Sequence, residues 1–206
     1  GGTCVNVGCV PKKVMWYAAT IQSTLKHSKD YGFNLSSQEF DWTALVEARD
    51  KYIERLRGLY NNRFDSLNIT AIKGFGKLKA PNTVEVNHQT YHAKHIILAT
   101  GGKPHMPPIP GIEHALTSDD FFNLRTQPKK VAIVGSGYIA VEIAGVLAAL
   151  GSETHLFCRK EFPLSHFDSD IQKHFYKQAK DNGIIIHNHH TPVKIHTPCK
   201  IEFNAG

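Results

Sequence analysis

Long apolar runs are missing from this sequence of 206 residues, and none approaches the roughly 18 consecutive residues that a membrane-spanning helix needs. No charged stretch followed by an apolar one opens the chain, so no secretory signal peptide is indicated. The formal charge is +6, but Lys and Arg are scattered and form no basic block or zinc-finger spacing. We therefore expect no membrane and no nucleic acid as partners, and an anionic small molecule explains the charge equally well.

Cysteine is also scarce, with four residues in the whole chain. Cys158 and Cys199 lie far apart and show no disulfide framework of the kind found in small secreted domains. This usage indicates a reducing compartment, and the cytoplasm is the expected location. In such a compartment, a closely spaced pair of cysteines is more often catalytic than structural.

Cys4 and Cys9 form such a pair within the opening segment GGTCVNVGCVPKK, where glycines lie on both sides of them. Their spacing allows a small disulfide ring. An apolar helical pattern follows from about Pro11, which places Cys9 at or beside a helix N-terminus, where the helix dipole lowers a thiol pKa. Taken alone, these residues allow either a structural disulfide or a redox-active pair.

Helices and short strands are predicted in the first half of the chain. Apolar residues recur at helical intervals over residues 12–26 and 41–67, and Asp41 suits the N-cap of the second helix. The period then changes to two, which is typical of strands. The strands predicted from this pattern are residues 70–79, 83–87 and 90–93. Residues 95–99 are expected to form a buried strand before a glycine turn, and a proline-rich crossover follows.

Strands and helices alternate in the second half, which predicts a parallel sheet. The predicted elements are strands 131–134, 154–158 and 184–187 and helices 138–150 and 171–182. The first strand and helix are joined by the GxGxxA turn Gly135-Ser136-Gly137-Tyr138-Ile139-Ala140. Gly135 permits the tight turn, and Gly137 lets the backbone approach a pyrophosphate at the helix N-terminus. These features predict a dinucleotide-binding unit.

The end of the second strand of this unit indicates which dinucleotide is bound. NAD-binding units carry Asp or Glu about twenty residues after the turn. Here the strand over residues 154–158 ends without an acid, and Arg159 and Lys160 follow it directly. Because a guanidinium can bind a 2′-phosphate through two parallel hydrogen bonds, the residues favour NADPH over NADH.

These motifs together resemble glutathione reductases, which are class I pyridine nucleotide-disulfide oxidoreductases. The similarity includes the cysteine segment and residues 97–102, 117–122 and 137–142, in the order and spacing of that family. Val10-Pro11-Lys12-Lys13 separates this branch from the dihydrolipoamide dehydrogenases, whereas trypanothione reductases share it.

The resemblance implies an α/β fold with two Rossmann-like dinucleotide-binding domains, both incomplete, and a small antiparallel β insertion. Residues 1–111 would be a partial FAD-binding domain with the redox-active disulfide, and residues 112–206 a partial NADPH-binding domain. It also implies that the sequence is an internal segment of a longer polypeptide that forms a homodimer. The isolated segment is expected to be inactive.

The chemistry implied by the resemblance is the reduction of glutathione disulfide by NADPH through FAD and a Cys4–Cys9 disulfide. Cys9 would be the thiolate beside the flavin, and Cys4 would attack the substrate. Lys12 and Glu142 would pair near the flavin. Tyr60 would contact glutathione disulfide. The cofactor-binding residues implied in this way are Thr3, Cys4, Lys12, Gly76, Ala99, Thr100, Gly101, Gly135, Ser136, Gly137, Tyr138 (over the nicotinamide pocket), Ile139, Glu142, Arg159 and Lys160.

Two features fall outside this pattern. The family presents a second arginine six residues after the first, and Ser165 stands in its place, with Lys160 and His166 as candidate substitutes. The preference for NADPH over NADH is therefore expected to be weaker than in the family. The second feature is a histidine cluster in which no cysteine or carboxylate has matching ligand spacing, so no metal site is expected. Its members are His187, His189, His190 and His196.

Two other functions remain open from the sequence. One is another disulfide reductase of the family, such as a trypanothione or mercuric reductase. The other is a non-catalytic nucleotide-binding module in which Cys4 and Cys9 are only structural.

Overall fold

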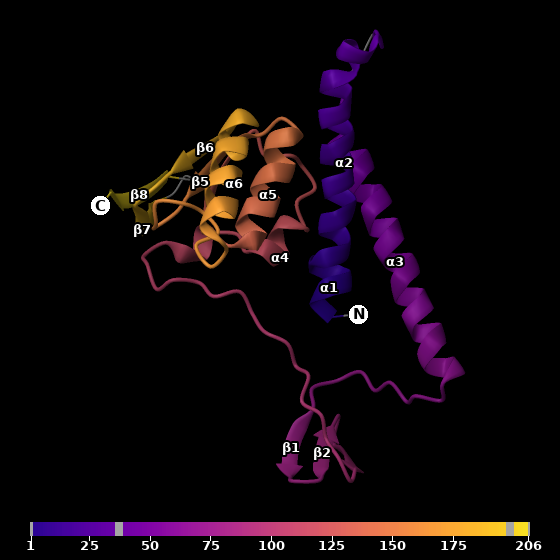
Figure 1. Cartoon of the computed structure of the whole chain (residues 1–206). Coiled ribbons are helices and arrows are strands. Elements are labelled where there is room, and N and C mark those ends of the chain that lie inside the picture. The colour runs from indigo at the N-terminus through magenta and orange to yellow at the C-terminus, as the bar shows by residue number, and fades with distance from the viewer. Residues whose placement is uncertain (1, 36–38, 197–199, 206) are drawn as a thin grey trace.

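The computed structural model describes residues 2–35, 39–196 and 200–205, so Cys199 lies outside the described residues (Figure 1). Three parts follow one another along the chain. Two long helices come first, a small sheet on extended segments follows, and a parallel sheet with helices and a hairpin completes the chain.

The N-terminal helices are α1 (Gly2–Val7), α2 (Cys9–His27), the 3₁₀ turn η1 (Ser28–Tyr31) and α3 (Trp42–Ser66). The sequence pattern predicts α2 and α3 but not α1. Helix α3 begins where expected because the Asp41 carboxylate accepts a hydrogen bond from the Ala44 amide at 3.1 Å. Within the described ranges, no helix combines the length and apolarity that crossing a bilayer requires.

The small sheet contains β1 (Lys77–Ala80), β2 (Thr83–Val86) and β3 (Gln89–His92) in that order, with both pairs antiparallel. The prediction of a strand over residues 70–79 is wrong for residues 70–76. Strand β1 pairs only with β2, and its register begins at Lys77 opposite Glu85. The backbone before Lys77 has no strand partner in the described sheet, and a strand without hydrogen-bonding neighbours does not form.

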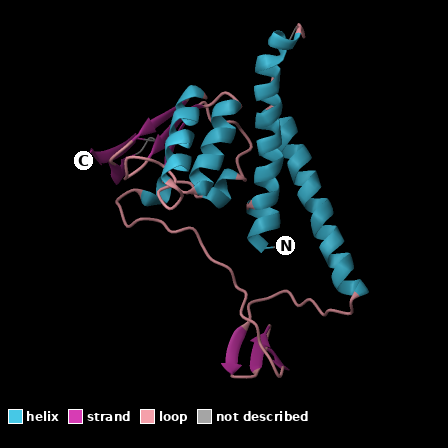
Figure 2. Ribbon diagram, viewed as in Figure 1, coloured by secondary structure: helices cyan, strands magenta, loops and turns pink. Residues whose placement is uncertain are grey.

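Residues 95–99 do not form the predicted buried strand. Ile97 and Leu98 are 89% and 68% exposed, and the chain runs as a loop from the small sheet to η2 (Ile112–His114) (Figure 2). Their apolar composition is typical of a central strand. In the described part of the chain, however, no strand lies beside them to bind their backbone or cover their side chains.

The predicted alternation in the second half is confirmed. Its elements are α4 (Ser118–Phe121), β4 (Lys130–Val134), α5 (Tyr138–Ala149), β5 (Glu153–Phe157), α6 (Ser169–Asp181) and β6 (Ile184–His187). The strands are parallel in the order β4-β5-β6. Leu156 of the sheet is fully buried with Ala144 of α5 and Ala179 of α6, so both helices pack on the sheet. This unit is the Rossmann-like part of the α/β fold.

A β-hairpin of β7 (His190–His196) and β8 (Lys200–Ala205) follows, and the sequence pattern does not predict it. The ring of Phe203 in β8 stacks on Phe157 of β5 with centroids 4.1 Å apart. Because Leu156 points toward the helices and side chains alternate along a strand, the hairpin contacts the opposite face of the sheet.

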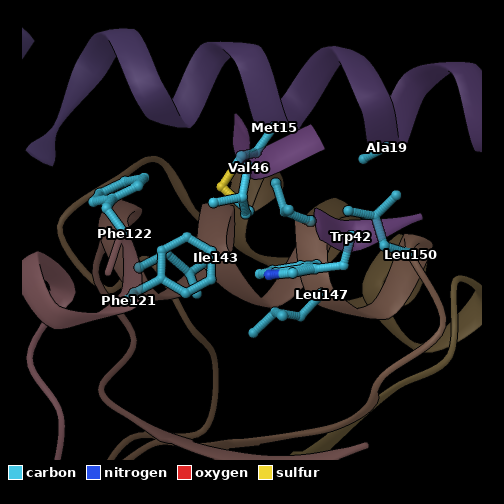
Figure 3. Packing of buried hydrophobic residues seen from close by; sticks show 10 residues of the cluster. Met15, Ala19, Trp42, Val46, Phe121, Phe122, Ile143, Leu147 and Leu150 are labelled. Atoms are coloured by element: carbon cyan, nitrogen blue, oxygen red, sulfur yellow. The ribbon is translucent and has the colours of Figure 1, made fainter. Parts of the chain in front are cut away.

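A hydrophobic core joins the N-terminal helices to the parallel unit (Figure 3). Its buried residues are Met15, Ala19, Trp42, Val46, Phe121, Phe122, Ile143, Val146, Leu147 and Leu150. Arg49 of α3 is 1% exposed beside this core, and its Nη2 donates to the Phe122 carbonyl at 2.7 Å. The predicted domain boundary between residues 111 and 112 remains a prediction, and the core takes residues from both sides of it.

Candidate functional site

Cys4 and Cys9 lie at the junction of α1 and α2. Cys9 is the first residue of α2, which confirms its predicted place at a helix N-terminus, and Cys4 lies in α1. A Cβ at Gly8 would lie 2.8 Å from the Thr3 carbonyl oxygen, which is closer than real side chains come. Glycine between the helices therefore lets the backbone of α1 approach the start of α2.

Both thiols are free and exposed, so the structure shows a dithiol where the sequence analysis expects a disulfide. The Cys9 side chain forms a hydrogen bond with Cys4, and this contact raises the pKa of the Cys4 thiol above its usual value. The two sulfur atoms are therefore neighbours. Their pairing and their separate roles remain predictions.

Lys12 and Glu142 form the ion pair that the resemblance implies. The Lys12 Nζ lies 2.8 Å from the Glu142 Oε1, and the two side chains are 25% and 33% exposed. Helix α2 also contacts α5 at Gly145, where the ring of Trp16 lies at ordinary contact distance, 3.5 Å, from the position of a Cβ. The ion pair thus connects the helix that begins at Cys9 with the helix that follows the glycine turn.

The glycine turn has the open geometry that a bound phosphate requires. Gly135 has φ +131°, which only glycine adopts readily, and its amide donates to the Phe157 carbonyl at 3.0 Å. No atom outside the immediate chain lies within 4 Å of a Cβ built at Gly137. Tyr138 and Ile139, the first residues of α5, are 60% and 44% exposed. Gly137 and the first residues of α5 are therefore exposed, whereas the Gly135 amide is bonded within the sheet.

Arg159 and Lys160 lie just beyond β5 and are exposed. Neither side chain has an ion pair or a hydrogen bond with the described residues. The loop that carries them is tied to the glycine turn, because the Leu164 amide donates to the Ser136 carbonyl at 2.7 Å. The loop that follows the two cations is therefore held beside the glycine turn.

The structure does not bring together all residues assigned to FAD. Thr3 and Cys4 are exposed near the start of α2. Gly76 and residues 99–101 lie on the extended segments that lead to and from the small sheet, which stands apart from the helices (Figure 1). Tyr60, assigned to the substrate, is 46% exposed on α3.

The histidine cluster contains a member that sequence reasoning missed. His155 Nδ1 lies 2.9 Å from His187 Nε2, and His155 Nε2 lies 2.8 Å from Glu153 Oε1. His187 stacks on Phe157 with centroids 4.2 Å apart. Burial, with the nearby charges of His155 and His190, lowers the pKa of His187 below its usual value. The alternation of His155 and Phe157 along β5 is the signal that would have placed them on one face.

Metal ligation has no support in this cluster. In the part of the chain that the structure describes, no group of three or more His, Cys, Asp or Glu side chains is arranged to hold a metal ion. The absence of a metal site therefore remains an expectation.

Sequence reasoning also missed a contact beside the cysteines. Arg57 Nε donates to Asn6 Oδ1 at 2.6 Å, from α3 to α1. No periodicity or motif connects two residues that are 51 positions apart.

Comparisons with known proteins agree with this geometry. The family model for pyridine nucleotide-disulphide oxidoreductases matches residues 1–203. The chain is 44% identical over 205 residues to a glutathione reductase of Schizosaccharomyces pombe and 45% identical over 186 residues to one of Yarrowia lipolytica. These matches cover 96% and 84% of this chain and 42% and 40% of the two relatives. The chain thus spans about two fifths of the length of these relatives.

The fold is also similar to solved structures. The HOCl-induced flavoprotein disulfide reductase RclA from Escherichia coli matches with a TM-score of 0.84 and 25% identity, over 100% of this chain and 45% of that chain. The Cu(II) complex of the same protein matches with a TM-score of 0.83 and 26% identity, over 100% of this chain and 44% of that chain.

Proposed function

Because the chain belongs to the pyridine nucleotide-disulphide oxidoreductase family, we propose that it is part of an NADPH-dependent glutathione reductase. The observation that carries the proposal is the 2.8 Å contact between Lys12 and Glu142. It joins the helix that begins at Cys9 to the helix that begins at the nucleotide turn. A thiol pair and a nucleotide site on adjoining helices are what electron transfer from NADPH to a disulfide needs.

In this proposal the glycine turn and the N-terminus of α5 hold the pyrophosphate of NADPH. Gly135 and Gly137 keep the backbone open, and Ser136 and Ile139 border the site. Arg159 binds the 2′-phosphate, with Lys160 as a second cation. Tyr138, exposed at the start of α5, lies over the nicotinamide pocket.

The residues on the dithiol side fit a flavin. Thr3 and Cys4 are exposed, and the Lys12 ammonium lies one helical turn after Cys9, where it favours negative charge on a bound group. We assign Gly76, Ala99, Thr100 and Gly101 to the same cofactor on the resemblance alone. FAD, when bound, would pass the two electrons of the NADPH hydride to the disulfide.

The dithiol would perform the substrate chemistry. Two electrons and two protons convert the Cys4–Cys9 disulfide into two thiols. The Cys4 thiolate then attacks one sulfur of glutathione disulfide, forms a mixed disulfide and releases one glutathione. The Cys9 thiolate attacks the Cys4 sulfur, which closes the ring and releases the second glutathione. Tyr60 on α3 would contact the substrate.

We further propose that the whole protein is a cytoplasmic homodimer. The cysteine usage supports the compartment, and the resemblance to glutathione reductases supports the dimer.

The test is the oxidation of NADPH by the full-length protein with glutathione disulfide as the only acceptor, followed by the loss of NADPH absorbance. We expect turnover that Cys4→Ser and Cys9→Ser each abolish, because both thiols are needed to open and close the ring. Cys158→Ser is the matched control, since this buried thiol is not part of the dithiol. Turnover with trypanothione disulfide or a mercuric salt, but not with glutathione disulfide, would replace the substrate assignment.

A further inference from the structure

Arg57 of α3 holds the short helix that carries Cys4. Its Nε donates to Asn6 Oδ1 at 2.6 Å, and Asn6 Nδ2 donates to the Gly2 carbonyl at 2.7 Å. Asn6 lies between the two cysteines in the sequence, so the guanidinium is hydrogen-bonded to α1 close to the thiol pair. Arg57 Nη1 also lies 3.4 Å from Glu54 Oε2, one turn earlier on α3.

Helix α1 depends on such contacts. It has six residues, and helices of that length are marginal without tertiary packing. Val5 is the residue of α1 that is buried. Among the described residues, the hydrogen bond from Arg57 is the contact that joins a polar side chain of α3 to a side chain of α1. Without it, the apolar contact of Val5 and the junction at Gly8 would have to orient α1.

We propose that Arg57 is a positioning residue that fixes α1 through Asn6 and thereby sets the separation of the Cys4 and Cys9 sulfur atoms. This inference rests on the proposed function, in which the two thiols close to a disulfide after each substrate reaction. The arginine fork suits this task because its rigid plane loses little entropy for each hydrogen bond that it forms.

The separation of the sulfur atoms governs the step that closes the ring. In that step, the Cys9 thiolate attacks the Cys4 sulfur of the mixed disulfide, the new sulfur–sulfur bond forms and a glutathione thiolate leaves. The rate depends on the effective concentration of one thiol at the other. A loosened α1 lowers that concentration. It also weakens the Cys9 contact that raises the pKa of Cys4, so this pKa moves back down toward its ordinary value.

The experiment uses the full-length protein in which Arg57→Ala, Asn6→Ala or both are introduced. Ring closure is followed by mass spectrometry as the conversion of the Cys4–glutathione mixed disulfide into the Cys4–Cys9 disulfide after glutathione disulfide is added to the reduced protein. The pH profile of iodoacetamide alkylation is read separately for Cys4 and Cys9 by mass spectrometry. Arg55→Ala is the matched control, since Arg55 is an exposed arginine on α3 without a hydrogen bond or ion pair to the described residues.

We expect each single substitution to slow ring closure by about three- to tenfold and to move the alkylation midpoint of Cys4 to lower pH. The double variant should slow ring closure no more than Asn6→Ala alone, because Asn6→Ala already removes the hydrogen bond to Arg57 together with the one to the Gly2 carbonyl. A lower melting temperature with unchanged Cys4 alkylation would show a merely structural role and overturn the inference, as would equal behaviour of the Arg57→Ala and Arg55→Ala proteins. Failure of the unaltered protein to form the Cys4–Cys9 disulfide would overturn the proposed function instead.

Discussion

At the scale of single residues, a charged pair joins the helix that begins at Cys9 to the helix that follows the glycine turn. The Lys12 and Glu142 side chains are each about a third exposed or less, so solvent screens their attraction only in part. Removing either one leaves the other charge in a half-buried place without its partner, which costs more than losing an exposed pair. Arg159 is the opposite case, an exposed cation with no partner among the described residues, and it is available to a ligand.

Arg159 carries a prediction about coenzyme choice. In the full-length protein, Arg159→Ala should raise the Michaelis constant for NADPH about ten- to a hundredfold, because a charge-assisted contact with the 2′-phosphate is lost. The Michaelis constant for NADH should hardly change, since NADH lacks that phosphate. Steady-state kinetics with each coenzyme provide the measurement, and Lys160→Ala, expected to have a smaller effect, is the neighbouring control. Equal increases for both coenzymes would contradict the assignment.

At the scale of elements, β5 connects the glycine turn to the hairpin. Its end binds the turn through the Phe157 carbonyl, and the Cys158 amide donates to the His187 carbonyl at 2.9 Å. On the hairpin side, the rings of His155, Phe157, His187 and Phe203 form an aromatic layer. Glu153 accepts from His155 and pairs with Lys130, and these two contacts lower the pKa of Glu153 below its usual value.

This layer predicts a dependence of stability on pH. The folded pKa of His187 lies below its ordinary value of 6.5, so the folded state binds fewer protons than the unfolded state just below that pH. The stabilisation is therefore complete above pH 6.5 and is lost as the pH falls through the lower folded pKa. Urea unfolding of the full-length protein from about pH 5 to about pH 8 measures it.

The variant for that experiment is His187→Phe, which keeps a ring against Phe157 and removes the titrating group. We expect it to flatten the loss of stability at acidic pH. His189→Asn is the control, because His189 is exposed in the turn that follows β6 and has φ +58°, which asparagine tolerates. An unchanged pH slope in His187→Phe would show that other groups are responsible.

At the scale of the whole molecule, one hydrophobic core unites helices from both halves of the chain. Met15 of α2 and Val46 of α3 pack with Ile143 and Leu147 of α5 (Figure 3). This core holds α2 against α5 and so keeps the helix that begins at Cys9 in a fixed relation to the helix that follows the glycine turn.

The shared core predicts that the two parts unfold together. Met15→Ala should lower the free energy of unfolding of the full-length protein by about 2–5 kcal/mol, because it leaves a cavity where the side chain is fully buried. Ile21→Ala, on the same helix but 60% exposed, should change it by no more than about 0.5 kcal/mol. Urea unfolding followed by tryptophan fluorescence and by circular dichroism should give coincident transitions. Two separate transitions, with only one of them shifted by Met15→Ala, would show that the parts are independent.

The sequence by itself determined the elements whose stability is local and the motifs whose chemistry is contained in a short segment. Asp41 caps α3 as expected, the alternation over residues 131–187 is the parallel unit, and the glycine turn lies between β4 and α5. The same pattern was wrong about residues 70–76 and 95–99, because a strand exists only where a neighbour binds its backbone.

Only the tertiary structure decided that Arg57 meets Asn6 and that His155 meets His187, at positions 51 and 32 residues apart. The Lys12–Glu142 pair, 130 residues apart, is implied by the family resemblance but not by any pattern of spacing in the sequence. The periodicity of apolar residues shows which face of a helix or strand is buried. It does not show which polar side chain of another element will lie opposite. Packing of α2 against α5 and pairing of β5 with β6 supply that information, because they fix the distances at which charges and hydrogen bonds act.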